Sequence, residues 1–220
     1  MSASSADSAP RTVIAGWSRS RIAVDGGPIL DVGSGAYPNP AADILCDAEV
    51  DDDCHRHGAE LVIDRPFVVA RVEALPFRAK AFSFVIASHL AEHVADPAGF
   101  CREVARVGRA GYIETPSPLA DVLLHEDYHV WRVHHRRGVL RFRRKKARSQ
   151  VLAATTERFY RFFYAGRPDC SRPTWRLPRG WAGRAMAFAL KAFGAALARL
   201  GVMHTRYAFS QGRPLRFEID

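Results

Sequence analysis

Cysteine is scarce in this sequence of 220 residues, and none of its four cysteines pairs with another at C-x-x-C spacing. We therefore expect reduced thiols in a cytoplasmic protein. Residues 1–10 lack the apolar core of a signal peptide, and we expect residues 1–21 to be disordered or loosely docked. The sequence also lacks internal repeats.

Acidic residues are scarce in the second half of the chain. Residues 1–115 carry 11 Lys/Arg and 16 Asp/Glu, a net charge of −5, whereas residues 116–220 carry 21 and 7, a net charge of +14. This asymmetry indicates that the two halves face different partners. The length and the 48% apolar composition are typical of one globular core with one appended region.

The most informative stretch is the first buried strand together with the glycine turn that follows it. An apolar, β-prone run at residues 29–32 leads directly into Gly33 and Gly35, which let a ligand approach the backbone closely. Asp31 lies at the carboxyl end of this strand, where open α/β sheets bind ligands and where a carboxylate can hold an α-ammonium group. Pro38 stands where G-x-G-x-x-G would have its third glycine, which argues against NAD.

A second strand is predicted at residues 43–46, and it ends at Asp47. Pro38 and Pro40 lie in the link before it and leave almost no room for a helix. A carboxylate at the tip of the second strand can accept hydrogen bonds from both hydroxyls of a ribose. Asp47 also begins the acidic run 47–53, so a solvated acid is the other interpretation.

Three more strands are predicted, at residues 67–70, 82–87 and 112–114. Asp96 and Pro97 start a helix between the last two of them, with Asp as the N-cap and Pro at the first helical position. Apolar residues recur every three to four positions and form one face of this helix, and Gly108 is expected to end the helix.

Four segments carry a resemblance to a known family: Ile29–Gly35, Glu73–Phe77, Ala87–Val94 and Gly111–Pro118. They contain an Asp-x-Gly-x-Gly turn, an Ala-Leu-Pro-Phe box and a Glu-His-Val sequence. In order and spacing they resemble the small class I S-adenosylmethionine-dependent methyltransferases of type 11. The resemblance covers residues 28–118 and implies a Rossmann-like sheet with helices on both faces. It also implies methyl transfer from S-adenosylmethionine to an acceptor.

The resemblance assigns the cofactor site by position. Asp31, Gly33 and Gly35 would cradle the methionine part of S-adenosylmethionine, and Asp47 would bind its ribose. Ser88, after the strand that faces this turn, is added to the cofactor-binding set, although its residue type also suits an N-cap.

The adenine contact departs from the family. Main-chain groups of Val72 and Glu73 would recognise adenine, but the family usually carries an Asp two residues before this Glu. Here that residue is Arg71, which has no acceptor to offer. The shortened first helix is a second departure, because the family has a full helix between its first two strands.

His89 and His93 lie just past a buried strand, near the place where the family transfers its methyl group. A histidine there can take a proton from an acceptor hydroxyl, and we assign the role of general base to His89. The alternative for both is a histidine at a helix start that bonds to nearby backbone.

Residues 125–129 match the letters of the zinc-protease motif H-E-x-x-H. That motif needs both histidines on one helix face, together with a third ligand. Here a helix is expected to end at Leu124 and a strand to follow at residues 130–133. We therefore interpret the match as chance and predict no metal site. A zinc hydrolase is kept only as a third hypothesis, and these residues are expected to line the acceptor pocket instead.

The basic half has two further segments of interest. Residues 136–148 hold eight Lys/Arg and no acid, which predicts a basic strand that is solvated or binds nucleic-acid phosphates or anionic lipid head groups. Residues 155–164 crowd aromatic side chains that could stack bases but are more commonly buried.

Residues 181–200 contain only three cations, spaced so that they share one narrow stripe of a helix. This pattern suits a helix in the lipid interface or one packed on the protein's own core, and it is a poor membrane span. Binding of nucleic acid requires positive charge but no wide apolar face. We therefore favour peripheral contact with an anionic membrane. Residues 207–209 and 215–219 are expected to form a closing hairpin.

The sequence therefore predicts a methyltransferase core over residues 22–150 and a basic, aromatic and helical extension over residues 151–220. The predicted acceptor is a small molecule or a lipid-linked group, and the expected location is the cytoplasm, with contact at the membrane surface. A degenerate methyltransferase fold that acts as a binding or scaffold module is the main alternative, favoured by Arg71 and by the shortened first helix.

Overall fold

The structure is a computed structural model that describes residues 11–14, 21–24, 26–51, 56, 59–124, 128–145, 188, 192, 196 and 200–220. The aromatic segment 155–164 and most of the predicted helix 181–200 lie outside these residues. Among the residues described, no helix is both long and apolar enough to cross a membrane.

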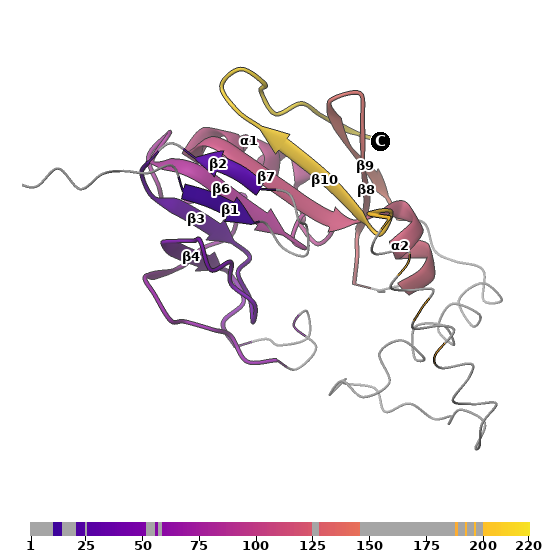
Figure 1. Ribbon diagram of the computed structural model, residues 1–220, viewed down its shortest axis with the longest axis horizontal. Coiled ribbons are helices and arrows are strands. Elements are labelled where there is room, and N and C mark those ends of the chain that lie inside the picture. The colour runs from indigo at the N-terminus through magenta and orange to yellow at the C-terminus, as the bar shows by residue number, and fades with distance from the viewer. Residues whose placement is uncertain are drawn as a thin grey trace, which may run out of the picture.

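A six-stranded sheet forms the centre of the molecule, in the order β10-β7-β6-β3-β4-β5 (Figure 1). Its strands are β3 (Ile29–Val32), β4 (Ile44–Asp47), β5 (Phe67–Val69), β6 (Phe82–Ser88), β7 (Gly108–Pro116) and β10 (His204–Phe209). The five strands from β3 to β7 run parallel, and β10 joins the edge of β7 in the antiparallel direction. This arrangement confirms the predicted Rossmann-like sheet.

The chain order reverses between β3 and β6. From β3 the chain moves outward through β4 to β5, and it then returns to place β6 on the other side of β3. Parallel sheets of this kind bind ligands in the crevice at the carboxyl ends of the two strands that flank such a reversal. The two loops that follow β3 and β6 are therefore the first place to look for a site.

The link between β3 and β4 contains no helix, as its two prolines predict. Side chains fix this short connection instead. The amide of Asn39 donates to Asp31 Oδ2 at 2.7 Å, and the amide of Ile29 donates to Asp43 Oδ2 at 2.8 Å. The shortened connection thus draws the chain back across the end of β3.

Helix α1 (Pro97–Val107) starts as predicted, with Asp96 Oδ1 accepting from the amide of Ala98 at 3.0 Å. The helix ends at Val107 with Gly108 as its C-cap, as predicted, and the Gly108 amide donates to the Val104 carbonyl. Gly108 is extended and not left-handed, because it is also the first residue of β7. A Cβ on Gly108 would come within 2.8 Å of Val85 Cγ2, which makes glycine necessary for packing against β6.

A second sheet has three strands in the order β11-β9-β8: β8 (Trp131–Arg136), β9 (Val139–Arg144) and β11 (Phe217–Ile219). It shares one hydrophobic cluster with α1 and the central sheet, through side chains that include Phe100 of α1 and Phe142 of β9. The predicted basic strand is confirmed over residues 139–144, because its arginines alternate with the buried Leu140 and Phe142.

The predicted closing hairpin is wrong. β10 pairs with β7 in the central sheet, whereas β11 belongs to the second sheet, where it pairs with β9 in parallel. In the N-terminal segment, which was expected to be disordered or loosely docked, β1 (Arg11–Ile14) pairs with β2 (Arg21–Val24) in the antiparallel direction as a separate sheet.

Candidate functional site

The glycine turn after β3 lies against the loop after β6. Gly33 has a φ of +67°, and a Cβ on it would come within 3.0 to 3.2 Å of three carbon atoms of Leu90. Gly35 has a φ of +51°, and a Cβ there would meet only the Arg56 side chain, at 3.6 Å. Gly33 is therefore required both by its backbone conformation and by close packing, whereas Gly35 is required mainly by its conformation.

Asp31 ends up buried at this turn, with only 4% of its surface exposed. Burial raises the pKa of its carboxyl to about 7, and the hydrogen bond from the Asn39 amide only partly opposes this shift. A cationic ligand group beside this buried carboxyl would stabilise its ionised form, because few other groups offset the cost of burying the charge.

Asp47, at the end of β4, contacts the same turn. Its Oδ2 accepts from the amide of Gly35 at 3.0 Å, and its Oδ1 accepts from the amide of Glu49 at 3.0 Å. Each oxygen keeps a further lone pair for another donor, such as a ribose hydroxyl. The structure thus brings together four of the residues that the sequence assigned to the cofactor: Asp31, Gly33, Gly35 and Asp47.

Val72 and Glu73 follow the neighbouring strand β5. Val72 is buried, and Glu73 Oε1 accepts from the amide of Ala95 at 3.2 Å, which ties this turn to the start of α1. Arg71, with 65% of its side chain exposed, lies 3.5 Å from Glu73 (Nε to Oε2). The Arg71 side chain is therefore turned to the surface.

Two residues of α1 hold the Ala-Leu-Pro-Phe box in place, and sequence analysis had not singled them out. Glu103 Oε2 accepts from the amide of Leu75 at 2.8 Å. The Arg106 guanidinium donates to the carbonyls of Phe77 at 2.7 Å and Leu75 at 3.0 Å. The sequence does contain an indication of their role: Glu103 and Arg106 are three residues apart, so this acid and this base lie on the same side of a helix.

His89 directly follows β6 and has a φ of +54°, so it lies in a turn and not at a helix start. Its amide donates to the Glu114 carbonyl at 2.8 Å, and its Nδ1 lies 3.5 Å from Glu92 Oε1. With 37% of its side chain exposed, the ring reaches solvent. Ser88 is the last residue of β6, and no described helix begins there for it to cap.

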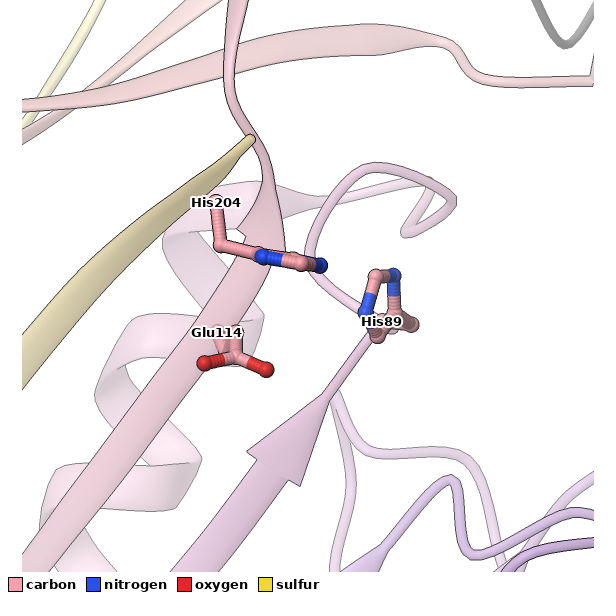
Figure 2. Close-up of side chains that lie close together, drawn as sticks. All are labelled: His89, Glu114 and His204. Atoms are coloured by element: carbon pink, nitrogen blue, oxygen red, sulfur yellow. The ribbon is translucent and has the colours of Figure 1, made fainter. Parts of the chain in front are cut away.

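Figure 2 shows His89 pointing toward two side chains that sequence analysis missed, Glu114 of β7 and His204 of β10. The two imidazole rings meet edge to face with centroids 5.5 Å apart. Glu114 is fully buried, and its Oε2 accepts from the Tyr112 hydroxyl at 2.6 Å and from Arg206 Nε at 2.9 Å. Only the pairing of β10 with β7 places His204 here.

The two histidines of this cluster differ in basicity. Burial favours the neutral form of His89, but the contact of its Nδ1 with Glu92 at 3.5 Å and the charges of Glu92 and Glu114 outweigh this and raise the pKa of the His89 imidazole. Burial dominates at His204 and lowers the pKa of that imidazole. His89 is therefore the member of the pair suited to take up a proton.

The match at residues 125–129 does not form a zinc-protease helix. Helix α2 (Pro118–Leu124) ends before it, and the described end of the match, Tyr128 and His129, lies outside any helix. Residues 125–127 lie outside the described residues. His129 instead places its Nδ1 3.2 Å from Asp121 Oδ1, within the fold.

One known family matches the segment that contains the turn after β3 and the loop after β6. A family model described as a methyltransferase domain, of type 11, matches residues 30–113. A search of curated proteins found no match. Among solved structures, the chain is similar to the YcgJ protein of Bacillus subtilis, with 22% identity, a TM-score of 0.37, and coverage of 59% of this chain and 61% of that one.

The chain is also similar to an S-adenosylmethionine-dependent methyltransferase of Thermotoga maritima, with 18% identity, a TM-score of 0.31, and coverage of 41% of this chain and 44% of that one. It therefore spans less than two thirds of the length of either structure.

The parallel sheet, whose chain order reverses between β3 and β6, is that of a Rossmann-like α/β protein. Residues 30–113, which contain the turn after β3 and the loop after β6, match the family model of a type 11 methyltransferase domain.

Proposed function

We propose that the protein transfers a methyl group from S-adenosylmethionine to an acceptor. One observation carries the proposal: Asp31, the glycine turn and Asp47 meet at the reversal point of the sheet, within the segment that matches the methyltransferase domain. Asp31 would bind the α-ammonium group of the cofactor, and Asp47 would bind its ribose. Main-chain groups of Val72 and Glu73 would face the adenine.

Transfer itself requires little from the protein beyond alignment of the reacting groups. The acceptor oxygen or nitrogen attacks the methyl carbon, a new bond to carbon forms, and the carbon–sulfur bond breaks. The electron pair of that bond stays on sulfur, which becomes the neutral thioether of S-adenosylhomocysteine. We assign the released proton to His89, whose ring is exposed at the mouth of the crevice and held on its other side by Glu92.

Cofactor affinity should depend on the ionisation of Asp31. Its pKa is about 7, so the carboxyl is mostly neutral below that pH and cannot pair with an ammonium group. We expect the affinity for S-adenosylmethionine to rise roughly tenfold from about pH 6 to about pH 7.5, as Asp31 ionises. Isothermal titration calorimetry across this range measures the change.

Asp31→Asn is the matched variant for this test, because the amide keeps the shape of the side chain but cannot ionise. The variant should bind more weakly at the upper pH and should lose the pH dependence. Asp31→Asn protein that binds as tightly as the wild type at about pH 7.5 would show that Asp31 does not bind the ammonium group.

A binding or scaffold module remains the second candidate function. The observation in its favour is Arg71, which replaces the usual adenine-reading Asp and turns toward Glu73. Such a module would bind neither S-adenosylmethionine nor S-adenosylhomocysteine, so the same calorimetry separates the two functions.

We further propose that the protein acts in the cytoplasm on a small-molecule or lipid-linked acceptor, at the surface of an anionic membrane. The charge of +14 in residues 116–220 supports this, as do the exposed Arg143 and Arg144 on β9.

The protein should float with phosphatidylglycerol vesicles at low salt and dissociate as salt screens the charges. Reversing the charge of Arg143 and Arg144 together should weaken the binding about thirtyfold or more, because each basic side chain at the surface contributes about 1 kcal/mol. Equal recovery with neutral phosphatidylcholine vesicles, or no recovery at low salt, would contradict the proposal.

A further inference from the structure

We propose that Glu92, His93 and His129 form a binding site for a divalent transition-metal ion of the zinc class. Each of these residues offers one ligand atom, and the three atoms lie within 4.8 Å of one another. Two imidazoles and one carboxylate are a ligand set that such ions favour, whereas calcium and magnesium prefer oxygen ligands alone. The proposal does not depend on methyl transfer.

The Glu92 carboxylate lies in an environment that lacks a full counter-charge. Only 1% of its surface is exposed, and neither carboxylate oxygen has a hydrogen-bond donor in good geometry. Its nearest cationic candidates are imidazoles, with Oε1 at 3.5 Å from His89 Nδ1 and 3.8 Å from His93 Nε2. Within the described part of the chain, no Lys or Arg pairs with it. A buried carboxylate of this kind is costly unless a cation binds it.

His129 is oriented as metal-binding histidines are. It is 7% exposed, and its Nδ1 lies 3.2 Å from Asp121 Oδ1, which leaves Nε2 as the nitrogen that can bind an ion. Asp121 is held in turn by Arg132 Nε at 2.9 Å and Lys145 Nζ at 3.0 Å. These two cations compensate the charge of Asp121, whose carboxylate can therefore orient the imidazole.

Ring contacts fix the position of the second imidazole. His93 stacks on Tyr128 with centroids 5.4 Å apart and meets the His129 ring edge to face at 4.8 Å. Both histidines therefore lie beside Glu92 in restricted orientations, as a preformed site requires.

The cluster in Figure 2 is a less suitable cation site, although its three ligand atoms are also close together. The charge of Glu114 is already compensated by Arg206, at 2.9 Å, and its Oε2 also accepts from Tyr112. A metal ion there would lie close to the positive charge of the Arg206 guanidinium. Glu92 has no such Lys or Arg partner among the described residues, so its negative charge favours an added cation.

An ion at this site would join two parts of the fold. Glu92 and His93 belong to the loop between β6 and α1, and His129 lies just before β8 of the second sheet. Three protein ligands would leave one tetrahedral position for water. The ion would also fix Glu92, whose Oε1 contacts the proposed general base His89.

The test is to titrate protein without a histidine tag, previously dialysed against EDTA, with Co²⁺, which gives visible absorption bands when its coordination is tetrahedral. We expect one Co²⁺ per chain, displaced by one Zn²⁺, and a raised melting temperature with Zn²⁺. Wild-type protein that binds no stoichiometric ion would overturn the proposal, and it would leave a protonated histidine as the partner of Glu92.

Two variants locate the ion. Glu92→Gln and His129→Gln should each weaken Co²⁺ binding by at least about tenfold. Loss of even an outer partner of a metal ligand typically weakens metal binding by about tenfold to a hundredfold. His134→Gln, on β8, and His204→Gln, in the cluster of Figure 2, should leave binding unchanged. Circular dichroism at low temperature shows whether each variant is folded. Folded Glu92→Gln protein with wild-type affinity, or loss of binding in His204→Gln alone, would overturn the assignment.

Discussion

Replacing His89 by Gln should lower kcat for methyl transfer by about a hundredfold or more, the usual contribution of a general base. Gln keeps the size and polarity of the side chain but cannot take up a proton at neutral pH. Since His89 lies outside the cofactor turn, the affinity for S-adenosylmethionine should change little. Transfer of a labelled methyl group from S-adenosylmethionine to the acceptor, at saturating cofactor, measures the effect.

His134→Gln is the matched control for this variant, because it removes an imidazole from β8, away from the crevice. It should retain wild-type turnover. If His89→Gln and His134→Gln turn over equally well, His89 has a structural role only, and the proton leaves by another route.

Replacing Gly33 by Val should abolish cofactor binding. A non-glycine residue at a φ of +67° costs about 1 to 2 kcal/mol, and a β-branched residue costs more. The new Cβ would also come within 3.0 to 3.2 Å of Leu90, so the loops after β3 and β6 must separate. We expect at least a hundredfold loss of affinity, from calorimetry, with a lowered melting temperature.

The matched control is Gly26→Ala. A Cβ on Gly26 meets no atom within 4 Å, and its φ is not in the left-handed region. This variant should bind the cofactor as the wild type does. If Gly33→Val remains folded and binds with wild-type affinity, the turn after β3 is not the cofactor site.

Local signals in the sequence account for the parts of the fold that were predicted. The strand into the glycine turn, the helix start at Asp96 and the link that two prolines keep free of helix each depend on residues that are close in the chain. These elements also position Asp31, Gly33, Gly35 and Asp47, so the geometry of the proposed cofactor site was largely predictable.

The acceptor side was not predictable in the same way, because it depends on pairing between distant segments. His204 reaches His89 only because β10 joins β7, and no local pattern distinguishes that pairing from the expected hairpin with β11. The proposed metal site has the same origin, since His129 meets Glu92 and His93 from another part of the chain. The H-E-x-x-H match would pair His129 with His125, whereas the described residues place it beside Glu92 and His93.

The central claim is that the turn after β3 binds S-adenosylmethionine, and calorimetry with S-adenosylhomocysteine at about pH 7.5 tests it most directly. The product is stable, and its binding does not depend on knowledge of the acceptor. We expect one site per chain, competition by S-adenosylmethionine, and loss of the binding heat in Gly33→Val but not in Gly26→Ala. No heat of binding with millimolar S-adenosylhomocysteine or S-adenosylmethionine in the wild-type protein would contradict the enzyme account.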